Sequence, residues 1–551
     1  MKYIIGLIFG ISVVLLCSTG CLKDNEEAII DEELEFVFWS ADGTGSDIND
    51  NFESPVANKI RELTNVSIDL EYVIGDPRDR INYMVGNDDY PDFIYALEYS
   101  NIIVEAGGFI PLDDLIDTYG PNIKKLYGEE IKKLRYSEED PSIYFLGIPR
   151  IGNIRYEPER GFELQHIAVK EAGYPELKTL KDYESVIRQY VEAHPTTNGK
   201  PTIGLSLLAD DWRFKISITN PAAAATGGPD DGEWYYDLET GDAMLHLRRE
   251  EEREYFRWLN HMYNTGLLDP ESFVQKHDQY IAKIADGRVV GLADALWQFA
   301  DAEKELVQSN MAERTYGVYP LTLDESYTYM EFRPETYSGG YGIGISSSCK
   351  DPIAAIKFMD WMCTEEAMIL TRWGIEGIHY EVLDGKRVFL DEIGDQRNSD
   401  PDFSTKTGVN LYVWPWPGYG NGVKDSGGDY FDPSHRESII DDYNEEEKIT
   451  LEAYGVETWK DLYPDESNFE PSPYGVLWQI NIPNETLAAE IMKQYDELTA
   501  KYIPEAILTS PENFDTVWDT YMDALRIINV DAMEQSFNDL IDQRIRLWNV
   551  E

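Results

Sequence analysis

Residues 34–97 decide the fold class, because strand-like and helix-like segments alternate along them, beginning with LEFVFWSADG at 34–43. The apolar run in that segment predicts a strand, and the next segment places Val56 and Ile60 on one face of a helix that starts at Pro55. The alternation continues as helix SPVANKIRELTN (54–65), strand VSIDLEYVIG (66–75), helix PRDRINYMVGND (77–88) and strand PDFIYAL (91–97). Such alternation builds a mainly parallel sheet with helices on both faces, so the sequence predicts an α/β fold.

The carboxyl ends of these predicted strands mark the expected ligand side, because open α/β sheets bind ligands beyond those ends. The ends are Trp39-Ser40-Ala41-Asp42 and Ala96-Leu97-Glu98. We therefore expect Trp39, Asp42 and Glu98 to contact a ligand.

The rest of the chain predicts a second lobe. Residues 160–310 are helix-rich, and the extended run YSGGYGIGISSS (337–348) and further helices follow. This order predicts two lobes joined by several chain crossings, with the ligand cleft between them. We assign the lobes as 34–148 with 340–395 (lobe I) and 149–339 with 396–551, terminal helices included (lobe II).

One predicted crossing contains a pair of glycines. Tyr337 precedes Gly339 and Gly340 where the chain leaves lobe II. We expect Tyr337 to face the cleft and the glycines to be hinge positions that absorb backbone rotation.

The N-terminus has the layout of a secretory signal, in which a positive residue, a short apolar run and small residues precede Cys21. The segment STGC (18–21) resembles a bacterial lipobox, with Ser18 where that motif prefers Leu. We expect 1–20 to be a lipoprotein signal peptide and 21–33 an acidic tether, with lipid on Cys21 holding the protein at the membrane. The alternative is an ordinary secretory signal with an incidental cysteine.

Charge and cysteine content narrow the function. The 551-residue chain has a formal net charge of −56, which disfavours nucleic-acid binding and repels anionic lipid headgroups. Beyond Cys17 and Cys21, the cysteines are Cys349 and Cys363, which flank a predicted helix. That helix separates them too far for a disulfide, so we predict two buried, inert thiols.

Several segments, in order, resemble one family, the extracellular solute-binding lipoproteins of bacterial ABC transporters, specifically the family-1, carbohydrate-type group. They are YFRWLNHMYNTGLLDPESF (255–273), DQYIAKIADGRVVGLADALW (278–297), GIGISSSCKDPIAAIKFMDWMCTEEA (342–367), TRWGIEGIHYEVLDGK (371–386) and DTVWDTYMDALRIINVDAMEQSFNDLIDQR (515–544). The resemblance implies a two-lobed, periplasmic-binding-protein-like fold that captures a sugar, an oligosaccharide by our expectation, and presents it to a membrane permease. It also implies a ligand-stacking aromatic at Trp297.

Some large members of that family carry an EF-hand-like calcium loop, and this chain departs from the pattern. The comparable stretch HPTTNGKPTIGL (194–205) has no run of carboxylates. A second candidate, Asp42–Glu53, has Asp47 where a calcium loop needs glycine. We expect no metal and no cofactor, with calcium as a minority alternative.

A sugar site needs flat aromatic platforms for C–H faces and polar side chains for hydroxyl groups. Tryptophans embedded in amphipathic helices are expected in the core, whereas those at strand ends or in loops are candidates for the cleft. The aromatic candidates are Trp39, Trp212, Trp297, Tyr337, Trp373, Trp414 and Trp416. The polar candidates, near predicted strand ends, are Asp42, Glu98, Arg150 and Asp294.

Two other functions remain open on the sequence. A binding lipoprotein for peptides or other non-sugar solutes would share the fold and the anchor. A surface-anchored glycosidase or polysaccharide lyase would need paired carboxylates, and acidic residues are abundant. The common hydrolase, zinc-protease and nucleotide-binding motifs are absent from the sequence, so we favour binding over catalysis. We expect a monomer, lipid-anchored on the extracellular face of the bacterial cell membrane, that works with an ABC permease.

Overall fold

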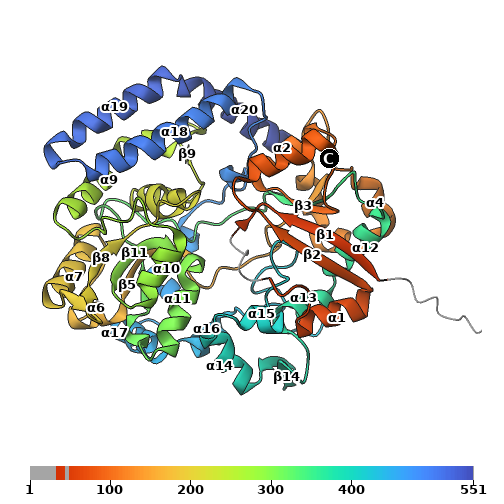
Figure 1. Cartoon of the computed structure of the whole chain (residues 1–551), viewed down its shortest axis with the longest axis horizontal. Helices are drawn as coiled ribbons and strands as arrows, with labels where there is room; N and C mark the ends of the chain where they lie inside the picture. The colour runs from red at the N-terminus through yellow and green to blue at the C-terminus, as the bar shows by residue number, and fades with distance from the viewer. Residues whose placement is uncertain (1–32, 44–48, 550–551) are drawn as a thin grey trace, which may run out of the picture.

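The computed structural model describes residues 33–43 and 49–549 and shows two lobes side by side, each built on its own sheet (Figure 1). The predicted signal peptide, Cys21 and the tether up to residue 32 lie outside the described residues. Among the described helices, none is long and apolar enough to cross a membrane.

Lobe I is built on a five-stranded sheet in the order β2-β1-β3-β13-β4. Strand β1 pairs in parallel with β2 and β3, and β13 is antiparallel to both β3 and β4. Strands β1 and β2 run from the outer side toward the middle of the molecule, so their carboxyl ends point toward the other lobe (Figure 1). The strands are β1 (Leu34–Ser40), β2 (Val66–Tyr72), β3 (Phe93–Tyr95), β4 (Phe145–Gly147) and β13 (Gly342–Ile345).

Local sequence signals explain where the lobe I helices begin. In α1 (Pro55–Thr64), the side chain of Ser54 accepts a hydrogen bond from the backbone N–H of Ala57 at 3.2 Å, and proline occupies the first turn. Helix α12 (Pro352–Met362) repeats this arrangement with Asp351 as the capping residue. The other lobe I helices are α2 (Pro77–Asn87), η2 (Leu97–Tyr99), α3 (Ser100–Glu105), α4 (Asp113–Tyr119), α5 (Pro121–Tyr127), η3 (Gly128–Leu134) and α13 (Glu365–Trp373).

Lobe II is built on a four-stranded sheet in the order β12-β5-β11-β8, in which β11 is parallel to β8 and antiparallel to β5. The strands are β5 (Arg160–Gln165), β8 (Ile203–Ser206), β11 (Val289–Ala295) and β12 (Tyr316–Tyr319). The terminal helices lie along one side of this lobe, where α18 packs on α9, α19 and α20 (Figure 1). The longer helices are α6 (His166–Glu171), α7 (Leu180–Ala193), α8 (Asn220–Ala225), α9 (Glu250–Asn264), α10 (His277–Ala285), α11 (Leu296–Gln308), α16 (Arg436–Asp442), α17 (Glu445–Tyr454), α18 (Leu487–Leu508), α19 (Phe514–Ile527) and α20 (Val530–Asn549).

Short elements complete the chain. Two small hairpins belong to lobe II, and a third, β14–β15, precedes α14 and α15. The hairpins are β6 (Thr196–Thr197) with β7 (Lys200–Pro201), β9 (Trp234–Asp237) with β10 (Asp242–Leu245), and β14 (Tyr380–Leu383) with β15 (Lys386–Phe389). The short helices are α14 (Asp391–Ser399), α15 (Phe403–Thr407) and the π-helix η4 (Lys215–Thr219). The 3₁₀ turns are η5 (His246–Arg248), η6 (Ala312–Arg314), η7 (Trp459–Leu462), η8 (Glu466–Asn468), η9 (Leu477–Gln479) and η10 (Pro511–Asn513).

The predicted assignment of 396–551 to lobe II is wrong for its first part. Phe403, Tyr412 and Phe431 are buried in the same core cluster as β1 and β3, whereas Tyr443 joins the lobe II core. The chain therefore returns to lobe II between Phe431 and Tyr443. The sequence does not indicate this placement, because residues 396–431 are rich in glycine, proline and aspartate and have no strand or helix periodicity that would assign them to one sheet.

The two cysteines outside the N-terminal segment are free and buried. Burial raises the pKa of the Cys349 thiol to about 12 and raises that of Cys363 as well. Both thiols are therefore protonated and unreactive at neutral pH, as the sequence predicted.

The Gly339–Gly340 pair is packed tightly. Both residues have positive φ, +71° and +62°. A Cβ on Gly339 would lie 2.1 Å from the carbonyl oxygen of Lys133, and one on Gly340 would lie 2.6 Å from the side chain of Gln479. The structure therefore shows close packing that leaves no room for a side chain at either position, and the hinge role of these glycines stays a prediction.

We predict that Gly339→Ala lowers the melting temperature much more than Gly75→Ala. Gly75 also has positive φ (+84°) but has no atom within 4 Å of its ideal Cβ, so its substitution isolates the conformational cost of about 1–2 kcal/mol. Gly339→Ala adds a clash with backbone that cannot move freely. Circular dichroism melts of both variants test this, and equal shifts would contradict the close packing.

Candidate ligand-binding site

Two predicted tryptophans form an exposed aromatic platform on lobe II. Trp212 follows β8 in a loop, and Trp297 is the second residue of α11, directly after β11. Their rings stack with centroids 5.8 Å apart and planes inclined by 21°. They remain 40% and 52% exposed, which is unusual for large indoles and is typical of a binding surface.

A buried arginine supports this platform from below. The guanidinium of Arg213 lies 4.7 Å from the ring centroid of Trp212. Its Nη1 donates to Asp211 at 2.7 Å, while its buried Nε has no hydrogen-bond partner among the described residues. A cation on an indole face holds the ring in position.

Asp294 lies beneath Trp297 and supports it; it does not reach the surface. The side chain is only 2% exposed. Its oxygens accept hydrogen bonds from the Tyr280 hydroxyl (2.8 Å), the Gln298 amide (2.6 Å) and the backbone N–H of Ala295 (2.8 Å). In this structure Asp294 is therefore a supporting residue, and its contact with a ligand stays a prediction. Its bonds to Ala295 and Gln298 hold the first turn of α11, which carries Trp297.

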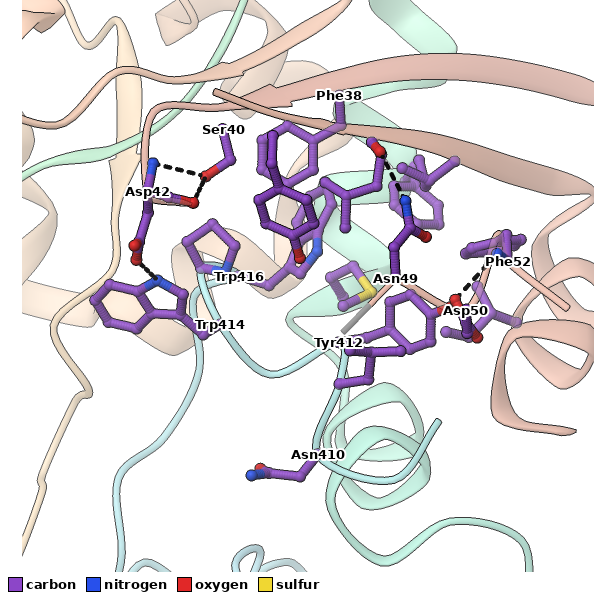
Figure 2. A pocket seen from close by; sticks show the side chains of 18 residues that line it. Phe38, Ser40, Asp42, Asn49, Asp50, Phe52, Asn410, Tyr412, Trp414 and Trp416 are labelled. Carbon is purple, nitrogen blue, oxygen red and sulfur yellow. Dashed lines mark hydrogen bonds between the residues drawn. The ribbon is translucent and has the colours of Figure 1, made fainter. Parts of the chain in front are cut away.

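Lobe I has a cavity of about 140 Å³ between the carboxyl end of β1 and residues 410–416 (Figure 2). Aromatic side chains make up much of its wall, and carboxylate and amide groups lie at its edge. The lining includes Phe38, Ser40, Asp42, Asn49, Asp50, Phe52, Tyr72, Tyr412, Trp414 and Trp416. Cavities of about this size accommodate one six-membered ring.

Asp42 and Trp414 meet at one end of this cavity. The indole Nε1 of Trp414 donates to the Asp42 carboxylate at 3.0 Å, as Figure 2 shows, and its ring packs edge-on against Tyr95 at 5.9 Å. Trp414 is 49% exposed, so one face of its ring is available to a ligand. At the other end, the Tyr412 hydroxyl donates to Asp50 at 2.5 Å.

Arg150 fixes the segment that carries Trp414. Its Nη1 and Nη2 donate to the carbonyl oxygens of Trp416 (2.7 Å) and Val413 (2.5 Å). Burial, with a smaller contribution from the neighbouring Arg372, lowers the pKa of Arg150 to about 9. Arg150 therefore positions the segment, and the fork of donors that we expected to bind a ligand is already used.

Glu98 connects the two surfaces. It lies just after β3 on lobe I, and its side chain is exposed. Desolvation by the surrounding protein raises the pKa of Glu98, and the ammonium group of Lys215 on lobe II offsets part of this rise. Lys215 begins η4, three residues after Trp212. The end of the lobe I sheet therefore faces the loop that carries the lobe II platform.

Three aromatic candidates are buried, and a fourth packs in the crossing segment. Trp39, Trp373 and Trp416 are 2%, 3% and 4% exposed. Trp39 packs in a lobe I core cluster, Trp373 donates to the carbonyl oxygens of Tyr430 and Phe431, and Trp416 is surrounded by Phe38, Phe93 and Phe358. Tyr337 packs on Tyr127 in the crossing segment. In this structure each of these four residues is used in the core or in the crossing, and their contact with a ligand stays a prediction.

The sequence reasoning missed four residues of the site: Arg213, Lys215, Asp50 and Tyr412. Arg213 and Lys215 had a detectable signal, because they directly follow the predicted Trp212. Tyr412 had none, because its contact with Asp50 joins segments 362 positions apart.

No group of three or more potential metal ligands occurs in the part of the chain that the structure describes. Residues 44–48 of the calcium-loop candidate lie outside that part.

Two α/β lobes, a pair of exposed aromatic surfaces and crossings between the lobes define a two-lobed solute-binding protein. The family of bacterial extracellular solute-binding proteins matches residues 57–373, more than half of the chain. The chain therefore belongs to this family, and the predicted family and two-lobed fold are confirmed.

Known relatives are similar at low identity. The fructooligosaccharide ABC transporter substrate-binding protein FusA of Streptococcus pneumoniae is 24% identical over 245 residues, 42% of this chain and 44% of FusA. Lipoprotein LipO of Bacillus subtilis is 21% identical over 346 residues, 60% of this chain and 65% of LipO. The matched stretch thus spans less than two thirds of either relative.

Solved structures share the fold across nearly the whole chain. FusA in complex with kestose superposes with a TM-score of 0.63 at 18% identity, covering 92% of this chain and 99% of FusA. The alginate-binding protein AlgQ2 superposes with a TM-score of 0.62 at 18% identity, covering 93% and 98%. At this identity the likeness shows the fold alone.

We predict that the stability difference between the wild type and Asp294→Asn grows as the pH falls from 7 to 4.5. Burial raises the pKa of Asp294 from 3.8 to about 6. Because the folded-state pKa is the higher one, the proton stabilises the native state below about pH 4, and this contribution is lost as the pH rises through 6. Its full size is about 3 kcal/mol for a shift of about two pKa units.

Thermal melts of both proteins across this pH range test the assignment. A difference that stays constant with pH would show that Asp294 is not the titrating group.

Proposed function

We propose that this protein captures an oligosaccharide between its two lobes and delivers it to an ABC permease. The observation that carries the proposal is the Trp212–Trp297 platform, which presents stacked, exposed indoles on lobe II beside the junction. Indole faces fit the C–H faces of sugar rings, and few other solutes need so broad an apolar surface with hydrogen-bonding groups nearby. The name of FusA, a fructooligosaccharide-binding relative, supports the same class of solute.

The second surface supplies polar contacts. On lobe I, Trp414, Asp42 and Glu98 offer one indole face and two carboxylates that can accept hydrogen bonds from hydroxyl groups. A ligand held on lobe II gains these contacts only when the lobes approach. The closed form then binds more tightly, and the ligand shifts the population toward it by that difference in affinity.

We predict that Trp297→Ala and Trp212→Ala each weaken oligosaccharide binding at least tenfold. Each removes one stacking contact and the apolar area buried with it, on the order of 1.5–3 kcal/mol. Tyr83→Ala is the matched control, because Tyr83 is 60% exposed on α2 and outside both surfaces.

Isothermal titration calorimetry after a thermal-shift screen of sugars, amino acids and short peptides measures this effect, with chromatography of the recovered ligand. Shifts with peptides alone would contradict the sugar assignment, and conversion of the sugar to a product would indicate an enzyme. Unchanged affinity in both tryptophan variants would place the ligand elsewhere.

We also propose that the protein is anchored by lipid on Cys21 at the outer face of the cell membrane. The support is the lipobox-like segment at 18–21 and the relative LipO, which is named as a lipoprotein. A diacyl anchor retains a protein that its own net charge of −56 would keep away from an anionic surface. It also raises the concentration of the protein near its permease.

We predict that Cys21→Ser moves the protein from the membrane fraction to the medium or soluble fraction and abolishes labelling with an alkyne fatty acid. Cys17→Ser is the matched control, because Cys17 lies in the signal peptide that is cleaved off. Fractionation of bacterial cells that express each variant tests the anchor. Retention and labelling of Cys21→Ser would indicate that Cys21 is not the lipid attachment site.

A further inference from the structure

Another exposed indole lies where the chain passes between the lobes. Trp478 is the middle residue of η9 and is 38% exposed, whereas its neighbours Leu477 and Gln479 are buried. Its ring centroid lies 5.5 Å from that of Tyr341 of lobe I, with the two planes inclined by 59°. On the lobe II side, an ideal Cβ on Gly232 would lie only 2.7 Å from the Cβ of Trp478. Trp478 therefore contacts both lobes, and more than a third of it is still accessible.

The backbone that carries this indole is held by three side chains. Arg544 of α20 donates to backbone carbonyl oxygens on both sides of Trp478. The carboxylate of Asp231 accepts a hydrogen bond from the backbone N–H of Leu477 at 3.2 Å, and the Tyr341 hydroxyl donates to the carbonyl oxygen of Trp478. An aromatic side chain on a fixed turn loses little freedom when a ligand covers it, so it is preorganised for binding.

On lobe II, a short path of contacts leads from Trp212 to Trp478. Lys215 follows Trp212 by three residues and forms an ion pair with Glu233. Glu233 directly follows Gly232, the glycine that lies against Trp478. The Lys215–Glu233 ion pair therefore links the aromatic platform to the place where Trp478 meets lobe II.

On lobe I, Glu98 lies near both Lys215 and Tyr341. Burial, and then the charge of Glu98, raises the pKa of the Tyr341 hydroxyl, which is bonded to the Trp478 backbone. Glu98 is exposed to solvent, yet the surrounding protein desolvates it enough to raise its own pKa. A carboxylate that is both exposed and partly desolvated lies in a recess rather than on a convex surface. Polar groups from both lobes therefore lie near each other between the platform and Trp478.

We propose that Trp478 forms a second sugar subsite, so that the protein binds chains that reach from the Trp212–Trp297 platform to Trp478 more tightly than shorter chains. This inference rests on the proposed sugar-binding function and adds a requirement for chain length. One ring of the ligand stacks on the platform, and a ring farther along the same chain covers the Trp478 indole.

The two contacts reinforce each other. Lys215 and Glu98 supply a donor and an acceptor for hydroxyl groups of the units between the two rings. Once one ring is bound, stacking of the second is an intramolecular event, so a chain that spans both subsites gains affinity beyond that of either contact alone.

The test measures affinity against chain length on the whole mature protein. Calorimetry first identifies which of the fructo-, malto-, cello- and alginate oligosaccharides of two to six units bind the wild type. Within the series that binds most tightly, affinity is expected to rise at least tenfold from the disaccharide to a longer chain. It is then expected to level off, because further units lie beyond both indoles.

Substitutions of Trp478 test the origin of this gain. Trp478→Leu removes the flat indole but keeps an apolar side chain against Tyr341, and it is expected to lower the ratio of long-chain to disaccharide affinity at least fivefold. Trp478→Phe keeps a ring and is expected to retain part of the gain. Trp297→Ala, in the platform, is the matched comparison and is expected to weaken the disaccharide as well. Circular dichroism melts confirm that the variants are folded.

The outcomes separate this inference from the function on which it rests. Wild-type affinity that does not rise with chain length, or a Trp478→Leu variant that keeps the wild-type ratio, would overturn the second subsite while sugar capture stands. Equal weakening of every chain length by Trp478→Leu would also overturn it, because Trp478 would then act through the junction of the lobes. If no sugar of any series binds, the proposed function fails, and the subsite fails with it.

Discussion

The rest of the structure depends on the pairing of β13 between β3 and β4. Strand β13 lies in the interior of the lobe I sheet, yet the chain reaches it only after it has built the lobe II sheet. Lobe I therefore cannot complete its hydrogen-bond ladder until the chain has crossed to lobe II and returned. This requirement accounts for the first two crossings, after β4 and before β13, and for the close approach of backbone at Gly339.

The C-terminal segment strengthens this connection between the lobes. Arg546, near the end of α20, forms an ion pair with Glu138 of lobe I at 3.2 Å, and Lys133 lies over the ring of Trp548 at 4.9 Å. The Tyr341 hydroxyl of lobe I also donates to the backbone of Trp478. Contacts at this side of the junction therefore join the lobes.

The sequence predicts those parts of the fold whose signal is local. Pro55 and Asp351 mark helix starts that the structure contains, and the alternation over 34–97 yields the parallel strands β1, β2 and β3. Residues 403–431 could not be placed, because what holds them in lobe I is packing of Phe403, Tyr412 and Trp416 against residues far away in the sequence. Long-range packing of this kind leaves no periodic pattern.

The candidate site likewise contains residues that a local sequence signal predicts and residues whose environment depends on long-range packing. Trp212 and Trp297 could be predicted because a large aromatic in a loop or just past a strand end has few ways to be buried. Trp39 and Trp416 also lie at a strand end and in a loop, yet both are buried. Adjacent strand residues point to opposite faces of a sheet, and a loop can fold back into the core. Asp294 lies next to Trp297 in sequence and in space, but whether its carboxylate faces solvent or supports its neighbour depends on partners such as Tyr280.

The two surfaces differ in the side chains that form and support them. Trp212 and Trp297 cover one face of each other, Arg213 holds the first indole, and Asp294 holds the helix start that carries the second. A platform fixed in this way loses little side-chain entropy on binding, so it is preorganised for the flat face of a ring. The lobe I surface differs in composition, since the half-exposed indole of Trp414 there is hydrogen-bonded to the carboxylate of Asp42. In the proposed function, lobe II therefore contributes the stacking surface, and lobe I contributes the polar contacts that a ligand gains when the lobes approach.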